Sequence, residues 1–458
     1  MKTWFERLAQ AVCRPLPGAG GAVERTMLHV AAEHSDFVRF NRGAVRQMTR
    51  VEQYQATVTL VAGQRRAACR VSLSGNAQED IAVLLELSAS LSTDLPMVPP
   101  DPHLQMPQDR VDTCRDDQAE DGHDGERQTV LPPAEGIAGQ VLAHAAGLDL
   151  VGFYAAGPVV VAFADSRGQR NWHRVRSFHF EWSLYCQGDP AVRDRAVKSS
   201  YAGTAWDAQE FGRRMTQAKR RLALLERPAR ALPPGDYRTW LEPAAVGEIL
   251  STLAWGGFGI KERRTGTSSL AALDSGERAL SSQVMLAEAT SGGIAPAFTA
   301  SGHVRPDTVP LVAAGRNAQT LVSPRSAAEF GLVANADEGE FPASLDMAGG
   351  ALAAGDAPAA LGSGLWIGNL WYLNYSDRRR CRMTGMTRFA SFWVEDGELV
   401  APIAVMRFDD SVLRLFGDAL LDLSRETELQ PSSDTYDRRH LGSVRSPGAL
   451  LADMRFTL

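Results

Sequence analysis

Apolar and polar residues alternate over much of the N-terminal half, which predicts antiparallel β-strands. Glycines at positions 43 and 63 separate the segments 38–43, 53–63 and 69–73, because glycine adopts tight turns without strain. Further strands are predicted at 151–157, 159–164 and 178–186. In the last of these, side chains two positions apart share a face. One face is apolar and the other polar: Phe178, Phe180, Trp182 and Leu184 against His179, Glu181, Ser183 and Tyr185.

Helical spacing of apolar residues predicts helices at 1 to about 34, 79–91 and 133–146. A further helix begins at Asp207 and Glu210, which have the spacing of a capping box. It carries one apolar stripe, made of Phe211, Met215, Ala218, Leu222 and Leu225. Prolines at 228, 233 and 234 and a glycine at 235 follow, and a domain boundary is expected there.

A β-prone run at 235–241 meets Pro243, and an apolar helix pattern follows through Ala245, Ile249, Leu250 and Leu253. Proline suits the first turn of a helix because its missing N–H would have no partner there. The rest of the chain predicts mostly strands and loops, with strands at 365–375, 389–394 and 399–407 and short helices at 326–330 and 345–353. An Asp-Gly turn at 396–397 joins the last two strands.

Length and composition indicate an ordinary globular protein with two domains. The chain has 458 residues, of which 44% are hydrophobic and 22% charged, and a single core rarely grows so large. The expected domains are residues 1–230, with a polar insert at about 96–133, and residues 235–458. The net charge of −6 argues against non-specific binding to nucleic acid or to an anionic membrane.

Cysteine usage and hydropathy bear on the compartment. The five cysteines form no CxxC pair, which favours a reducing environment. The first ten residues interrupt their apolar positions with charges, unlike a signal peptide. No window approaches the ~18 consecutive apolar residues of a membrane span. A cytoplasmic location is therefore expected.

Several blocks resemble the TldD/PmbA (TldE) family, and specifically its PmbA/TldE-type branch. They are the strand-to-helix entry at 235–250, the segments 35–43, 309–315 and 327–331, and the near-terminal blocks 364–372, 384–388 and 392–402. The last contains Trp393-Val394-Glu395-Asp396-Gly397-Glu398, which is similar to the family's near-terminal sheet region. The resemblance covers nearly the whole chain and is specific in its second half.

The resemblance implies an α+β fold. The N-terminal domain would be a two-layer α/β domain of antiparallel strands and helices, and the C-terminal domain β-rich and barrel-like. It also implies pairing with a TldD-like zinc metallopeptidase subunit, or with itself as a homodimer, around a cavity that takes in unfolded peptide. The family's older label, modulator of DNA gyrase, finds no support in this acidic sequence.

The resemblance also locates where zinc ligands would fall. In the TldD branch, the helix after the proline carries a His-Glu-x-x-x-His motif, and those positions fall near Ser251, Thr252 and Gly256. The additional Cys ligand of that branch would fall near Leu370 or Trp371. None of these residues suits zinc or a general base. We therefore assign no catalytic, cofactor-binding or metal-ligating residue to this chain, and zinc is expected only in a TldD-like partner.

Other chemistry-bearing residues have simpler explanations. His29 and His34 are five apart, and on a regular helix they would point about 140° away from each other. His179, Glu181 and Tyr185 share a strand face that suits either a proton-transfer cluster or an ordinary polar surface. Cys381 lies beside the arginines 378–380 and 382, where a thiol can be reactive, although an incidental thiol is the favoured reading.

Three further patterns give weaker signals. The arginines 378–380 with Trp366, Trp371 and Tyr372 suggest stacking on nucleic acid, which the net charge disfavours. The glycine-rich segment 256–261 lacks the spacing of a P-loop. Ser251, Ser268 and Ser269 show no partnered histidine in the sequence.

The leading hypothesis is a non-catalytic TldE/PmbA-like subunit of a zinc metalloprotease that processes unfolded peptides. Its rivals are a stand-alone homodimeric peptide-binding protein and an active metallopeptidase whose ligands have no recognised motif.

Overall fold

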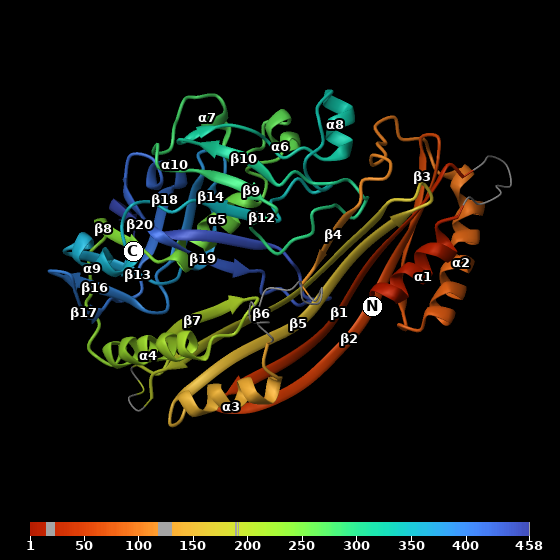
Figure 1. The fold of residues 1–458 in the computed structure, drawn as a ribbon. Coiled ribbons are helices and arrows are strands. Elements are labelled where there is room, and N and C mark those ends of the chain that lie inside the picture. The colour runs from red at the N-terminus through yellow and green to blue at the C-terminus, as the bar shows by residue number, and fades with distance from the viewer. Residues whose placement is uncertain (15–22, 118–130, 188–189, 191, 458) are drawn as a thin grey trace, which may run out of the picture.

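The chain folds into two β-sheets that lie against each other, with helices on the outer side of the first sheet (Figure 1). The computed structural model describes residues 1–14, 23–117, 131–187, 190 and 192–457. Strands β1 to β7 form the first sheet and β8 to β20 the second. The chain thus completes one sheet before it begins the other. The division into two domains near residue 235 stays a prediction.

The first sheet has seven strands in the order β3-β2-β1-β5-β6-β4, and β7 pairs with the far end of β6. Its members are β1 Arg25–Asn41, β2 Ala44–Ala62, β3 Arg65–Leu73, β4 Thr113–Asp116, β5 Asp149–Asp165, β6 Arg170–Tyr185 and β7 Ala196–Gly203. All neighbours run antiparallel except β4 and β6.

The even-numbered residues of the central strands face the helices. Leu28 and Val30 of β1 pack on α1 and α2 at one end of the sheet, and Val38 and Phe40 pack near α3 and α4 at the other. The odd-numbered residues face the C-terminal half: Val175 of β6, for example, contacts Ile294. The helices are α1 Lys2–Val12, α2 Ala77–Asp94, α3 Ala134–His144 and α4 Ala208–Leu225, with a 3₁₀ turn at Leu95–Met97.

The second sheet is mixed and open, without closure into a barrel among the described strands. Its main path is β11-β10-β9-β12-β20-β8-β13-β16-β17, and β14, β15, β18 and β19 branch from it. The strands are β8 Gly235–Leu241, β9 Leu286–Ala289, β10 Thr308–Ala313, β11 Arg316–Asn317, β12 Ser344–Met347, β13 Gly364–Ile367, β14 Trp371–Asp377, β15 Arg382–Met386, β16 Ser391–Glu395, β17 Glu398–Pro402, β18 Arg407–Ser411, β19 Leu420–Pro431 and β20 Ser443–Phe456.

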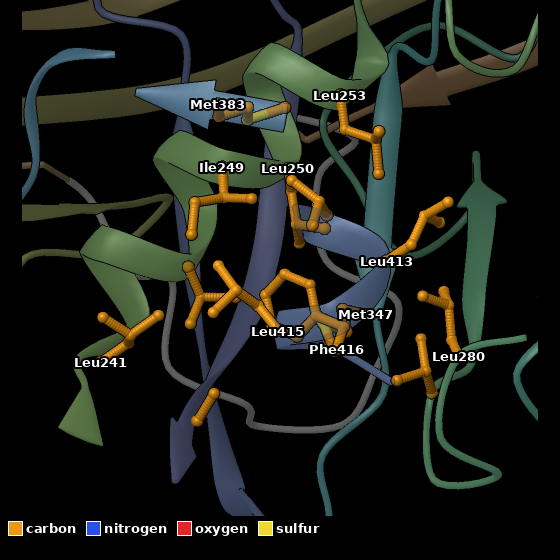
Figure 2. Packing of buried hydrophobic residues seen from close by; sticks show 14 of the residues in the cluster. Leu241, Ile249, Leu250, Leu253, Leu280, Met347, Met383, Leu413, Leu415 and Phe416 are labelled. Carbon is orange, nitrogen blue, oxygen red and sulfur yellow. The ribbon is translucent and has the colours of Figure 1, made fainter. Parts of the chain in front are cut away.

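Helix α5, Pro243–Ala254, is the centre of the C-terminal core (Figure 2). Ile249, Leu250 and Leu253 are almost fully buried and belong to one cluster with Leu415 and Phe416. The remaining helices are short: α6 Ile260–Arg264, α7 Ala271–Asp274, α8 Pro324–Phe330, α9 Ala357–Leu361, α10 Val412–Leu415 and a 3₁₀ turn at Ala354–Asp356.

Local signals predicted several elements correctly. The α+β class and the strand-rich C-terminal half are confirmed. Pro243 begins α5, and Asp207 caps α4 by accepting hydrogen bonds from the N–H groups of Gln209 and Glu210. The reciprocal half of the predicted capping box is absent, since the Glu210 carboxylate binds Arg213 and Arg214. Glu395 and Glu398 pair across the predicted hairpin.

Other predictions were wrong. The helix predicted for residues 1–34 ends at Val12, and Arg25–Asn41 is strand β1; residues 15–22 lie outside the described part. Of the helix predicted at 345–353, Leu345–Met347 belong to strand β12, which pairs with β9 and β20. The polar insert at 96–133 contributes β4 to the first sheet, and its residues 118–130 lie outside the description. The predicted strand at 365–375 is interrupted between β13 and β14.

Candidate functional site

A cavity of about 1200 Å³ lies between the two halves of the molecule. Strands β6 and β7 and helix α4 form its wall on the N-terminal side, and α5, β13, β14 and β19 form the other side. Its size is that of a site for a peptide or another large ligand. Residues that the sequence singled out are among those that line it, including His179, Glu181 and Ser251.

The polar face of β6 and β7 forms part of the cavity wall on the N-terminal side. Glu181 lies opposite Ser200, and Ser183 lies opposite Lys198, so Glu181 and Lys198 share one face of the sheet. The apolar face predicted for β6 is buried as expected, since Phe178, Phe180 and Trp182 are 1% exposed or less. Of the three polar residues that the sequence placed on one strand face, His179 and Glu181 line the cavity and Tyr185 does not.

Glu248 of α5 faces the same space and was missed in the sequence. Its carboxylate accepts a hydrogen bond of 2.6 Å from the N–H of Leu370. Burial raises the pKa of this carboxyl group to about 7, while the nearby Lys198 ammonium opposes that shift. One weak indication of this residue's role is present in the sequence: Glu248 is the one charged residue within Pro243–Ala254, a helix that is otherwise apolar or neutral.

Burial holds His179 in its neutral form. Only 4% of its surface is exposed, and desolvation, followed by the positive charge of Arg439, lowers its pKa to about 4. Its Nε2 atom has no hydrogen-bond partner within the described part of the chain. A buried polar atom without a partner is uncommon in proteins.

The positions that correspond to the family's zinc ligands do not fit a metal. Ser251 and Thr252 line the cavity, and the Thr252 hydroxyl donates to the Glu248 carbonyl oxygen at 3.0 Å. Gly256 follows the helix with a φ of +78°, and a Cβ atom added there would lie 2.3 Å from Nη2 of Arg378. The guanidinium of Arg378 thus fills the space that a side chain at position 256 would enter. Within the described residues, no three His, Cys, Asp or Glu side chains are placed to hold a metal ion.

The structure separates His29 from His34. Both lie on β1, and residues five apart on a strand point to opposite faces of the sheet. His34 Nε2 lies 2.6 Å from the Tyr54 hydroxyl. The helix predicted across this pair is therefore wrong, and the two side chains do not share a metal site.

Cys381, Ser268 and Ser269 have structural roles. Cys381 is fully buried, and desolvation raises its pKa to about 12, so the suggested reactive thiol is excluded. The Ser268 hydroxyl donates to the Gly257 carbonyl oxygen, and Ser269 accepts from the Tyr375 hydroxyl at 3.0 Å. None of these contacts involves a histidine.

The arginine run is partly engaged within the molecule. Arg378 donates to the Trp255 carbonyl oxygen at 2.6 Å and lies over the rings of Trp255 and Tyr375. Arg380 pairs with Asp377 at the surface. Trp371 stacks with Arg388 instead, at 4.5 Å. These contacts explain the side chains without nucleic acid.

No helix of the described residues is long and apolar enough to cross a membrane. Among curated proteins, the sequence has no match. Residues 234–458 match the family model of the PmbA/TldA metallopeptidase C-terminal domain.

Solved structures of similar fold cover almost the whole chain. TldE from Thermococcus kodakarensis is 11% identical, with a TM-score of 0.78, and the match covers 95% of this chain and 97% of that one. A candidate modulator of a DNA gyrase from Thermotoga maritima is 11% identical, with a TM-score of 0.71 and coverage of 94% and 96%. A candidate modulator of DNA gyrase from Bacteroides thetaiotaomicron is 14% identical, with a TM-score of 0.73 and coverage of 99% and 98%.

The C-terminal half thus carries a metallopeptidase-related domain, and the complete chain has the fold of these three proteins. Together with the sequence blocks at 235–250 and 364–402, the family-model match over residues 234–458 places the protein in the TldD/PmbA family.

Proposed function

We propose that this chain is a non-catalytic, TldE/PmbA-like subunit that pairs with a TldD-like zinc metallopeptidase. The proposal rests on which residues stand at the end of α5. Serine, threonine and glycine stand at the positions of the family's zinc motif, and the Arg378 guanidinium occupies the space beside Gly256. A permanent positive charge in that space opposes Zn²⁺ by direct repulsion.

The cavity supports a role in binding. It keeps a volume of about 1200 Å³ next to the altered helix end. Its walls mix charged groups with large aromatic rings, including those of Trp366 and Trp371, a combination that suits extended peptide of varied sequence. In the proposed assembly this chain helps to enclose unfolded peptide, while the partner subunit supplies zinc and hydrolysis.

The first test measures zinc content and native mass. The purified chain is analysed alone and after mixing with a TldD-like subunit from the same source, and hydrolysis of an unfolded protein is followed in each sample. We expect substoichiometric zinc in the isolated chain, a one-to-one complex after mixing, and peptidase activity only in the mixture. A partner whose zinc-motif glutamate is replaced by glutamine serves as the control, and this mixture is expected to be inactive.

Two results would replace the proposal by its rivals. Stoichiometric zinc and activity in the isolated chain would establish an active metallopeptidase with unrecognised ligands. A stable homodimer that does not bind the TldD-like subunit would establish a stand-alone peptide-binding protein.

A further inference from the structure

One corner of the cavity combines carboxylates and a cation from three different elements. Glu181 comes from β6, Lys198 from β7 and Glu248 from α5, and all three line the cavity. Glu181 and Lys198 both act electrostatically on the Glu248 carboxyl group. Segments far apart in the sequence therefore place two carboxylates and one ammonium group around one space.

The other cations of the cavity wall are already neutralised. Arg213 and Arg214 bind Glu210, and Arg214 also lies 3.3 Å from Glu428. Arg221 pairs with Glu242. By contrast, the side chains of Glu181 and Lys198 make no hydrogen bond or ion pair within the described residues. With both carboxylates ionised, the corner has one positive and two negative charges.

Glu248 is held in place for binding. The Leu370 N–H fixes one of its carboxylate oxygens at 2.6 Å, and the Asn369 side chain also hydrogen-bonds to the carboxyl group. Its side chain therefore needs little reordering to meet a ligand, and a preorganised group loses less entropy on binding.

His179 gives an independent indication of a ligand. It lies two residues before Glu181 on the same face of β6 and lines the same cavity. It is 96% buried, since 4% of its surface is exposed, yet Nε2 has no partner in the described part of the chain. In its neutral form, the imidazole offers Nε2 as an acceptor in one tautomer.

We propose that Glu181 and Glu248, with His179 beside them, form a subsite for an ammonium group of the bound peptide. The two carboxylates supply the charge, and Nε2 of His179 accepts one N–H of the ligand. Lys198 limits the subsite to a single extra positive charge. This inference rests on the proposed peptide-binding role and specifies the chemical class of the group that is bound.

The ammonium group has two sources in a peptide, the amino terminus and a lysine side chain. The probe is one unstructured peptide with a free amino terminus, a single lysine and an amidated carboxyl end, which carries a fluorophore on a cysteine. Three variants of this peptide are compared with it: one has an acetylated amino terminus, one has norleucine in place of lysine, and one has both changes. Binding is measured by fluorescence anisotropy with the full-length chain, alone and in its complex with the TldD-like subunit.

We expect the doubly neutral peptide to bind at least tenfold more weakly than the parent. The single change that reproduces this loss identifies the source of the ammonium group. E248Q and E181Q should each weaken the parent peptide about tenfold and leave the doubly neutral peptide unchanged. E428Q is the matched control: it removes a carboxylate of the same cavity that is already paired with Arg214, and the preference should persist.

A pH series adds a second readout. Because the pKa of Glu248 is raised to about 7, its carboxylate forms between pH 6 and 8. The series uses the acetylated peptide, whose lysine ammonium stays charged over that range whereas a free amino terminus does not, and its binding should strengthen as the pH rises. Glu181, Lys198 and His179 face it, and the pKa of His179 is about 4, below this range. E248Q should abolish the pH dependence.

Equal binding of the parent and doubly neutral peptides would overturn the inference. So would loss of binding in K198M, because that result would mean that the corner receives an anion; we expect K198M to bind the parent peptide more tightly. Thermal melting confirms that each variant is folded. If the complex with the TldD-like subunit forms but shows no preference for the ammonium group, this inference fails alone, whereas a preference without a complex refutes only the subunit role.

Discussion

At the scale of single residues, Gly256 and Arg378 decide what the end of α5 can hold. The backbone at Gly256 has a φ of +78°, which is strained for any residue with a Cβ atom. The Arg378 guanidinium is fixed against it by the Trp255 carbonyl oxygen and two aromatic rings. Backbone conformation and side-chain packing thus both favour glycine here.

This arrangement predicts different losses of stability for two glycines. Gly266 has a similar φ of +71° but nothing within 4 Å of an added Cβ atom. G266A should lower the free energy of unfolding by about 1 kcal/mol, through backbone strain alone. G256A should lower it by about 2 kcal/mol, because Arg378 must also give up its hydrogen bond. Urea unfolding measures both.

An R378A background separates the two contributions. There the difference between G256A and G266A should disappear, because no guanidinium remains to be displaced. A difference of the same size in both backgrounds would contradict the packing argument.

The cysteines divide by burial. Cys13 and Cys381 are buried, and desolvation raises the pKa of each thiol to about 12; Cys186 is also buried. Cys114 is exposed and Cys69 partly so. An aromatic disulfide reagent should therefore titrate two thiols in the native chain and all five in denaturant. Rapid native reaction of a C69S/C114S variant would contradict this prediction.

At the scale of elements, strand β6 contacts the layers on both sides of the first sheet. Phe178, Phe180 and Trp182 pack toward α3 and α4. On the opposite face, His173 Nε2 lies 3.0 Å from the Ile294 carbonyl oxygen, and His179 lines the cavity. Both histidines are buried, and desolvation lowers the pKa of each to about 4.

These depressed pKa values make stability depend on pH. Between pH 6.5 and 4, the unfolded chain protonates both histidines while the folded chain does not, so stability falls as the pH falls. Each histidine contributes up to about 3 kcal/mol to this loss. Glu248 has the opposite sign, because its raised pKa lets the folded state bind a proton between about 4.5 and 7.

Chemical unfolding from pH 7 to pH 4.5 tests the histidine contribution. H179Q should lose less stability over this range than the wild-type chain, and E248Q should lose more. Equal slopes for H179Q and the wild type would show that His179 titrates normally in the folded chain.

At the scale of the whole molecule, the loop between β19 and β20 anchors the C-terminal half to the first sheet. Arg439 is 5% exposed and donates to the carbonyl oxygens of Gly157 and Ser177 at 2.9 and 2.8 Å. The buried Glu33 carboxylate accepts from the Arg439 backbone N–H and favours the charged guanidinium. One residue of the second half thus binds polar groups on three strands of the first.

Loss of this anchor should destabilise the chain strongly. R439A leaves the Glu33 carboxylate buried without the guanidinium charge and removes the guanidinium donor from two carbonyl oxygens, which we expect to lower the free energy of unfolding by about 3–5 kcal/mol. R455A removes the surface pair with Asp236 and should change the melting temperature little. Similar melting temperatures for R439A and R455A would contradict the anchor.

Short-range sequence patterns were sufficient to predict an element wherever contacts between neighbouring residues determine it. The cap at Asp207, Pro243 at the start of α5, and the Glu395–Glu398 hairpin all depend on contacts within a few residues. Residues 25–34 misled the prediction because β1 is buried on both faces, by α1 and α2 on one side and by the C-terminal half on the other. A strand buried on both faces loses its alternation and resembles a helix in sequence.

The sequence by itself determined the α+β class, the family resemblance, and the absence of zinc-type residues at positions 251, 252 and 256. Only the tertiary structure decided that His179, Glu181, Lys198 and Glu248 share one cavity, because they come from strands and a helix up to 69 positions apart and meet through the packing of two sheets. It also decided that Arg378 fills the space beside Gly256. Local patterns fix local hydrogen bonds and faces, whereas burial and charge at a site depend on what the rest of the chain places around it.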